Sequence, residues 1–297
     1  MSAGLVDNSG TILEKVVVAR PVDQVGMEEG PIELAAKLLR PDVAAIGLGA
    51  AGLVTWPEGR LVWGPNVVGR DIPFKDSLIA KFGLPTAVDN DANLAALAET
   101  RIGAARGYRR VLLVTLGTGI GGGIVINDEI YRGRSFAGEV GHMMIDVGGP
   151  QCTCGQRGCW ETFASGRRLD QIARDVAAAD PNGLTASLAN RGAVAGSHLT
   201  EAAIQGDTQA VQAVEEMGSW LGMGLASLIV VLDPEIIVVG GGAARAGDIL
   251  LDPARRSMMA GLEGSQLRTT TPVVAAQLGE DAGMVGAGLA AAEANRG

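Results

Sequence analysis

Short apolar runs alternate with segments of helical periodicity along most of this 297-residue chain. An apolar pair at residues 5–6, a polar turn and a second apolar run predict a β-hairpin at the start. The predicted strands are residues 12–18, 43–48, 86–88, 111–116, 123–126 and 235–239, and the predicted helices are residues 32–40, 92–104, 167–179, 208–232 and 282–295. Such alternation indicates an α/β fold with mixed sheets and flanking helices. Residues 187–206 fit neither pattern, and we expect a surface excursion there.

Amino-acid composition, length and charge limit the classes of protein to which this chain can belong. Hydrophobic residues make up 47% of the chain and aromatic residues 3%, so Ala, Val, Leu and Ile build the core. The length is sufficient for two lobes, each with a core of its own. A formal net charge of −9 argues against a nucleic-acid partner, which requires a basic surface. The apolar stretch at residues 220–232 is too short to span a bilayer, and the first residues resemble no signal peptide, so we expect a cytoplasmic protein.

All three cysteines and one of the two histidines lie between Glu139 and Glu161. Three thiolates and an imidazole make a complete tetrahedral set for a structural zinc ion, with no position left for water. The candidate ligands are His142, Cys152, Cys154 and Cys159. Buried free thiols or a disulfide are the alternatives, and an odd cysteine count argues against the disulfide. Zinc would pin both ends of this loop and hold two carboxylates, which accept hydrogen bonds from a polyhydroxylated ligand.

Two glycine-rich turns follow apolar strands. Residues 116–123 read Leu-Gly-Thr-Gly-Ile-Gly-Gly-Gly, where unobstructed backbone N–H groups can surround a phosphate. A purely structural turn is the alternative, and no Lys-Ser or Lys-Thr pair follows to make a P-loop. Gly240, Gly241 and Gly242 end another strand and would let a nucleotide base approach, or would simply close the strand.

Three polar residues, Asp89, Asn90 and Asp91, stand between a strand and an alanine-rich helix. The carboxyl end of a strand is where α/β folds place ligand chemistry. One of the three residues is expected to cap the helix. Capping alone needs fewer polar side chains than the chain supplies here.

These features together resemble the ROK family of sugar kinases, and most of all its actinobacterial ATP-dependent glucokinases. The resemblance covers nearly the whole chain and is most specific in the zinc loop combined with Glu139-x-Gly-His142. The other matching segments are Gly-Leu-Val-Asp7, residues 47–52, Pro65-Asn66, Asn90-Asp91, residues 116–123, Ser165-Gly166 and residues 239–242.

The resemblance implies an actin-like ATPase (ribonuclease H-like) fold of two lobes. Residues 1–91 and 283–297 would form the small lobe, and residues 92–282 the large lobe with the zinc loop and the nucleotide site. The implied reaction is ATP-dependent phosphorylation of the 6-hydroxyl of glucose, with Mg²⁺ on the triphosphate and structural Zn²⁺. The partners would be a hexose and ATP, without nucleic acid or membrane, in a homodimer or homotetramer.

The resemblance also assigns roles to residues. Asp91 would be the general base that accepts the proton of the attacking hydroxyl. Sugar hydroxyls would be held by Asn66, Asn90, Glu139, His142 and Glu161, with His142 also a zinc ligand. The transferred phosphate would be held by Gly117, Thr118 and Gly119, and the adenosine would be bordered by Gly240, Gly241 and Gly242.

The chain departs from the family pattern at its start. The family opens with a strand carrying Asp-x-Gly-Gly-Thr, a first phosphate loop, whereas Met1 stands where the second family strand is already under way. We therefore expect the natural start to lie upstream and the 297-residue chain to be impaired in activity. Alternatives are another hexose or N-acetylhexosamine kinase and a non-catalytic, repressor-like sugar-binding protein; polyphosphate is not the expected donor.

Overall fold

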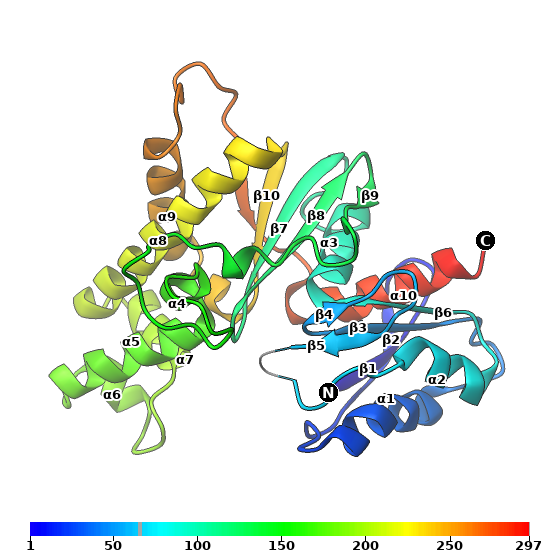
Figure 1. Ribbon diagram of the computed structural model, residues 1–297. Coiled ribbons are helices and arrows are strands. Elements are labelled where there is room, and N and C mark those ends of the chain that lie inside the picture. The colour runs from blue at the N-terminus through cyan, green and yellow to red at the C-terminus, as the bar shows by residue number, and fades with distance from the viewer. Residues whose placement is uncertain (65–66, 297) are drawn as a thin grey trace. The chain divides into compact units, whose positions relative to one another are not determined.

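The computed structural model (Figure 1) describes residues 1–64 and 67–296, which fold into two compact units. Unit 1 comprises Met1–Val111, Gly123–Gly138 and Gln277–Gly297. Unit 2 comprises Leu112–Gly122 and Glu139–Ala276.

Unit 1 begins with the predicted hairpin, in which β1 (Ser2–Val6) pairs antiparallel with β2 (Ile12–Val17). A separate parallel pair joins β3 (Ile46–Ala50) to β6 (Thr86–Asn90), and a short antiparallel pair joins β4 (Leu53–Val54) to β5 (Leu61–Trp63). The helices of this unit are α1 (Gln24–Leu38), α2 (Phe74–Phe82), α3 (Asp91–Arg101) and α10 (Ala282–Ala294).

Small residues let α10 pack closely on both α3 and β3. A side chain at Gly286 would meet the carbonyl oxygen of Leu94 at 1.8 Å, and one at Gly47 would meet that of Ala287 at 1.9 Å. Such contacts tolerate only hydrogen at these positions. Helix α3 thus belongs to the same compact unit as α10, which differs from the lobe boundary that we expected at residue 91.

The largest sheet has five strands in the order β11–β10–β7–β8–β9. Its strands are β7 (Arg110–Leu116), β8 (Ile120–Ile126), β9 (Glu129–Ile130), β10 (Ile236–Gly240) and β11 (Val273–Ala275). Strand β10 is buried along its whole length and runs parallel to β11, as its continuous apolar sequence predicts. The turn between β8 and β9 has Asn127 and Asp128 at φ of 55° and 70°, and it joins the two strands as an antiparallel hairpin.

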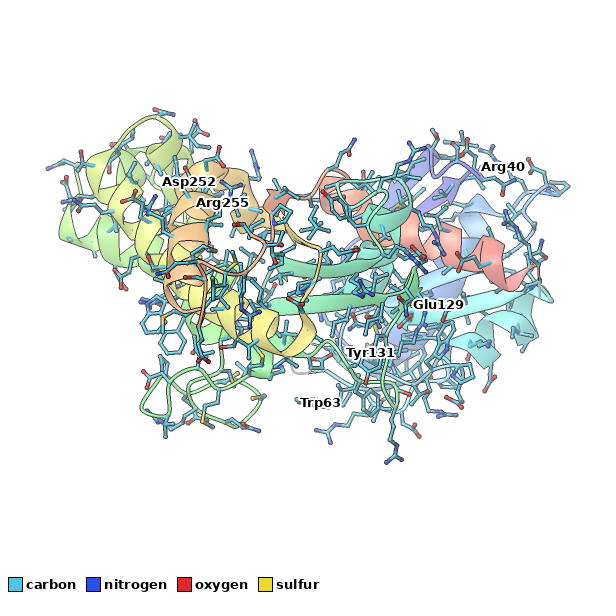
Figure 2. The ribbon with its side chains drawn as sticks, turned by 90° about the horizontal axis from the view of Figure 1, so that it is seen from above. Arg40, Trp63, Glu129, Tyr131, Asp252 and Arg255 are labelled. Atoms are coloured by element: carbon cyan, nitrogen blue, oxygen red, sulfur yellow. The ribbon has the colours of Figure 1, made fainter. Side chains whose placement is uncertain are left out.

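Unit 2 is mostly helical around β10 and β11. Its helices are α4 (Glu161–Ala164), α5 (Gly166–Ala179), α6 (Leu184–Leu188), α7 (Gly196–Ile204), α8 (Thr208–Leu232) and α9 (Asp248–Ala260). The expected surface excursion at residues 187–206 was wrong, because α7 lies within it and buries Leu199 and Ala202 completely. Figure 2 labels Arg255 and Asp252 on α9, and the Arg255 guanidinium donates to Asp252 and to the carbonyl of Val273 in β11.

Helix α8 bears on the prediction that the apolar stretch at residues 220–232 does not span a membrane. The strongly apolar stretch is part of a 25-residue helix, which is long and apolar enough to cross a bilayer. However, 56% of its most apolar window is buried inside the protein. The apolar residues are explained by packing, since α8 buries Leu221 and Leu225 completely.

Candidate functional site

The polar triplet at the end of β6 supplies the candidate residues that lie in unit 1. Asn90 is the N-cap of α3, and its Oδ1 accepts hydrogen bonds from the N–H groups of Ala92 and Asn93 at 2.8 and 3.3 Å. Its Nδ2 donates to the carbonyl of Gly52 at 3.1 Å. The predicted cap is therefore Asn90, which the family resemblance makes a sugar ligand.

Asp91 is the first residue of α3 and has a solvent-exposed surface. Protein atoms packed around it nevertheless remove hydration, and this desolvation raises the pKa of Asp91 above its ordinary value, against a smaller lowering by the N–H of Ala92. A raised pKa makes an aspartate a better proton acceptor, which suits a general base.

The glycine turns are a separate candidate feature, within unit 2. Residues 117–119 connect β7 to β8, so the turn is shorter than predicted, since β8 begins at Ile120. A side chain at Gly117 would meet no atom within 4 Å, so its backbone is open to a ligand. Gly241, at φ 86°, lies so close to the backbone of Leu116 that a Cβ would approach it at 2.6 Å. The two predicted glycine turns therefore lie side by side.

The start of α5 completes this arrangement. The N–H of Gly166 donates to the carbonyl of Gly117 at 2.7 Å. A Cβ on Gly166 would meet the same oxygen at 2.6 Å, which explains the glycine. Ser165 caps α5 by accepting from the N–H of Arg168 at 3.2 Å. The positive end of a helix thus lies beside the candidate phosphate turn, where it favours an anion.

The cysteine cluster has the geometry of a zinc site. The donor atoms of His142, Cys152, Cys154 and Cys159 all lie within 4.8 Å of one another. Sulfur ligands at a zinc–sulfur distance of about 2.3 Å are separated by roughly 3.8 Å in a tetrahedron. The Sγ atoms of Cys154 and Cys159 are 3.7 Å apart, and Cys152 Sγ lies 3.8 Å from His142 Nδ1. The three cysteines are free, so no disulfide competes.

Glu161 links the cysteine cluster to the phosphate turn. Its Oε1 lies 3.1 Å from Cys152 Sγ and 4.0 Å from His142 Nδ1. On its other side, Oε2 fills the space that a side chain at Gly119 would need, at 2.2 Å. Glu139 precedes the short 3₁₀ helix of Val140–His142, and the N–H of His142 donates to its carbonyl at 3.1 Å. Unit 2 therefore gathers both predicted carboxylates, the cluster and the glycine turns.

Asn66, a predicted sugar contact, lies outside the described residues. The other predicted site residues divide between the two units. Asn90 and Asp91 belong to unit 1, whereas the other candidates belong to unit 2.

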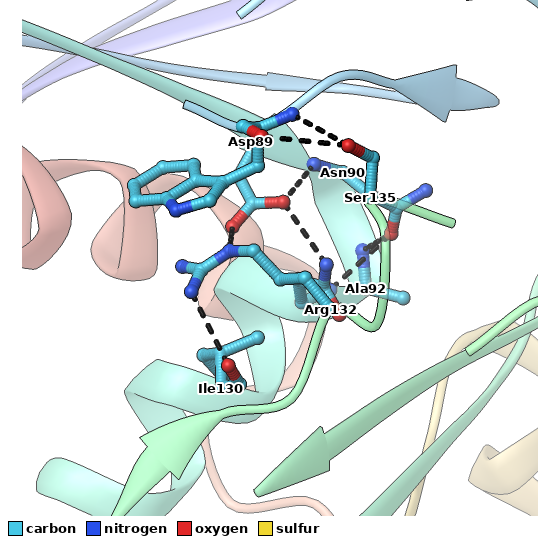
Figure 3. Close-up of polar contacts among 8 residues, drawn as sticks. Asp89, Asn90, Ala92, Ile130, Arg132 and Ser135 are labelled. Atoms are coloured by element: carbon cyan, nitrogen blue, oxygen red, sulfur yellow. Dashed lines mark hydrogen bonds and ion pairs between the residues drawn. The ribbon is translucent and has the colours of Figure 1, made fainter. Parts of the chain in front are cut away.

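An ion pair close to Asp91 in the sequence, with its carboxylate buried, was not predicted from the sequence. Asp89 is 2% exposed and accepts a hydrogen bond from Arg132 Nε at 2.7 Å, while the Arg132 guanidinium lies 3.7 Å from the ring centre of Trp56 (Figure 3). Arg132 follows β9 in the sequence, and no local pattern connects it with a residue 43 positions earlier.

A family profile described as "ROK family" matches residues 1–294. The chain belongs to the ROK family. This confirms the family recognised from the motifs and, with it, the actin-like ATPase fold of mixed sheets and flanking helices.

The relatives of named function include glucokinases and a xylose repressor. A glucokinase of Streptomyces coelicolor is 40% identical over 294 residues, which cover 97% of this chain and 92% of the relative. The crystal structure of a ROK family glucokinase from Streptomyces griseus in complex with glucose and AMPPNP matches with a TM-score of 0.90 and 41% identity, over 98% of this chain and 95% of the other. A xylose repressor of Bacillus subtilis is 31% identical over 81% of this chain, but only 59% of the repressor is matched.

Proposed function

We propose that this chain is a hexokinase-type phosphotransferase that moves the γ-phosphoryl group of ATP to the 6-hydroxyl of glucose. The observation that carries the proposal is the likeness, over 98% of the chain, to a glucokinase whose structure holds glucose and AMPPNP, an ATP analogue. The local geometry agrees with it. A desolvated aspartate stands at the start of α3, and the two neighbouring glycine turns have open space at Gly117, which lies beside the α5 amino terminus, and at Gly242.

The proposed chemistry assigns each group one task. Asp91 takes the proton of the sugar hydroxyl while that oxygen bonds to the γ-phosphorus and the bond from phosphorus to the β,γ-bridging oxygen breaks. The backbone of Gly117, Thr118 and Gly119 donates to the transferred phosphoryl group, whose charge the α5 amino terminus also favours. The turn at residues 240–242 borders the adenosine.

The proposed sugar contacts are side chains that hydrogen-bond to hydroxyl groups: carboxylate oxygens accept from them, amides donate or accept, and one histidine offers an imidazole ring nitrogen. They are Asn66, Asn90, Glu139, His142 and Glu161. The cysteine cluster would hold Zn²⁺, and the ion would supply no reactive water because four protein ligands complete its shell. Mg²⁺ would neutralise the triphosphate. A cytoplasmic location, where ATP and hexoses meet, belongs to the same proposal.

A second candidate is a sugar-binding protein without catalysis. It is favoured by the match to the xylose repressor of Bacillus subtilis over 81% of this chain. Such a protein would bind a sugar and leave ATP unhydrolysed. Another hexose or an N-acetylhexosamine is the alternative substrate within the kinase proposal.

The deciding experiment measures ADP formation with a panel of hexoses and N-acetylhexosamines. We expect glucose to give the highest kcat/KM. Asp91→Asn should lower kcat by about two to four orders of magnitude, the usual contribution of a general base, and leave glucose affinity largely unchanged. Asp42→Asn, which removes an exposed carboxylate of unit 1, is the matched control. Sugar binding without ADP formation would favour the non-catalytic candidate, and kcat of Asp91→Asn within about threefold of the parent would exclude Asp91 as the base.

A further inference from the structure

We propose that Asp89 and Arg132 are positioning residues that fix the direction of the Asp91 carboxylate. The inference rests on the proposed function, because Asp91 needs an orientation only if it accepts a proton. Neither residue would touch the substrate; both act through the backbone on which Asp91 stands.

The Asp91 side chain itself has little support. Its carboxylate accepts a hydrogen bond from the N–H of Ala92 at 2.9 Å. Within residues 1–64 and 67–296, no side chain donates a hydrogen bond to it. Its direction is therefore set by the backbone of residues 89–92, so the groups that hold this backbone decide where the base points.

Asp89 holds that backbone from the strand side. One carboxylate oxygen, Oδ1, accepts from the N–H of Asn90 at 2.7 Å and from Asn93 Nδ2 at 2.9 Å. The first bond fixes the peptide between Asp89 and Asn90, one residue before Asp91, and the second ties Asp89 to the first turn of α3. Asn90 holds the same turn from the helix side as its N-cap. Asp91 thus stands between Asn90 and Asn93, which are both held by hydrogen bonds.

Arg132 satisfies the charge that this arrangement buries. The second oxygen of Asp89 accepts from Arg132 Nε at 2.7 Å, and Arg132 Nη1 donates to the carbonyl of Ile130 at 3.2 Å (Figure 3). The guanidinium plane lies over the Trp56 ring, and the backbone N–H of Trp56 donates to Ser135 Oγ at 3.0 Å. Arg132 is therefore fixed at its nitrogens and across its face, as a planar guanidinium permits and a lysine does not.

Removing Arg132 leaves a buried carboxylate without its cation. Such a group is strongly destabilised, and it relieves the cost by turning toward water or by taking a proton. Either response loosens the bond that Asp89 accepts from Asn90, and the Asp91 backbone moves with it. A misplacement of about 1 Å in a reacting group can lower a rate by about a hundredfold.

The test compares kcat and sugar KM in Arg132→Gln, Asp89→Asn and the double substitution, all in the full chain. We expect each single substitution to lower kcat by about 10- to 100-fold, because orientation acts in the transition state, with sugar KM changed by less than about threefold. The double substitution replaces the ion pair with two amides that can hydrogen-bond to each other. Its kcat should exceed the value expected from multiplying the two single effects.

Arg101→Gln is the matched control. Arg101 lies at the other end of α3 and pairs with Glu293 at 3.1 Å, with side chains 40% and 51% exposed. Its loss should leave kcat and KM unchanged. If Arg132→Gln does not fold, Arg132→Lys keeps the charge but loses the planar stack on Trp56, and its kcat should fall by about tenfold.

Two results would overturn the positioning role. The first is that the parent enzyme phosphorylates hexoses and the folded Arg132→Gln variant keeps kcat within about threefold of the parent value. If Arg132→Gln does not fold, the Arg132→Lys variant is judged by the same limit. The other is a fall in kcat matched by an equal rise in KM together with purely multiplicative effects in the double substitution. A parent protein that phosphorylates no sugar while binding glucose would instead defeat the proposed function, so the two failures are distinguishable.

Discussion

Asn90 shows how one side chain can serve both the fold and the site. Its Oδ1 and Nδ2 are occupied by the α3 cap and by the carbonyl of Gly52. The two lone pairs of Oδ1 already accept from the N–H groups of Ala92 and Asn93, whereas Nδ2 uses one of its two protons and can donate one further bond. A sugar hydroxyl can thus bind Asn90 without breaking the cap, which keeps the ligand contact rigid.

The raised pKa of Asp91 predicts the pH dependence of the reaction. A general base must be deprotonated in the free enzyme, so kcat/KM falls as the pH drops through the pKa of that base. Since desolvation raises the pKa of Asp91, the acid limb should lie above the ordinary value of 3.8. Circular dichroism at each pH checks that the protein stays folded. A limb at or below 3.8, or an unchanged limb in the residual activity of Asp91→Asn, would contradict the assignment.

The loop of residues 142–161 is held by more than its cysteines. Trp160 is completely buried, its Nε1 donates to the carbonyl of Trp220 at 3.0 Å, and a side chain at Gly224 of α8 would meet its ring at 2.1 Å. The backbone N–H of Trp160 also donates to the carbonyl of Met143 at 2.8 Å. Glu161 therefore follows a fixed residue, and zinc would fix the remaining part of the loop.

Cys154→Ser should release the metal and weaken sugar binding. Loss of one of four ligands opens the zinc shell, and residues that depend on it lose their fixed orientation, with an effect on affinity of about 10- to 100-fold. Elemental analysis should find about one zinc per parent chain and much less in Cys154→Ser, with a parallel fall in glucose affinity. Thr153→Ser, between two of the ligands, is the control. Less than about half an equivalent of zinc in the parent protein would refute the zinc site.

In the turn after β10, alanine substitutions at the neighbouring Gly241 and Gly242 should have different effects on stability and on ATP binding. Gly241 has φ 86° and touches the Leu116 backbone, so Gly241→Ala should lower the free energy of unfolding by about 1–3 kcal/mol. A side chain at Gly242 would meet no atom within 4 Å, so Gly242→Ala should keep its stability and raise the KM for ATP. Urea unfolding and kinetics measure the two effects. If both variants were equally stable, the protein would accommodate a methyl group at Gly241 by moving the nearby Leu116 backbone, and the prediction would be wrong.

At the scale of the whole molecule, the chain passes between its two units four times, after Val111, Gly122, Gly138 and Ala276. Helix α3 of unit 1 supports two of these passages. Gly123 packs on the carbonyl of Ala92, and the buried Glu99 accepts hydrogen bonds from the N–H groups of Gln277 and Leu278 at 3.2 and 2.8 Å. The helix that begins with the candidate base therefore also anchors the chain at both points where it re-enters unit 1.

The quaternary structure remains a prediction from the family resemblance. We expect sedimentation equilibrium to give two or four times the chain mass of 30.3 kDa. Glucose and ATP should leave this value unchanged if assembly is independent of catalysis. A species of 30.3 kDa at micromolar concentration would contradict the expected homodimer or homotetramer.

The local elements were largely determined by the sequence. Helix α8 was predicted at residues 208–232 and spans Thr208–Leu232, because its apolar spacing and its Asp207 cap are both local signals. The cysteine spacing likewise predicted a four-ligand cluster, since the ligands are close in sequence and zinc chemistry demands that set. Helix α1 was less well predicted, because its first half, from Gln24, has few buried residues and depends on the Asp23 cap.

The relations between distant segments were decided by the tertiary structure. No pattern in the sequence connects Asp89 with Arg132, Gly117 with Gly166, or Gly241 with Leu116, yet these contacts order the candidate site. The physical reason is that sequence periodicity reports which face of an element is buried, but not which neighbour covers it. Motifs thus identified the groups available for chemistry, whereas packing determined which of them meet and how firmly each is held.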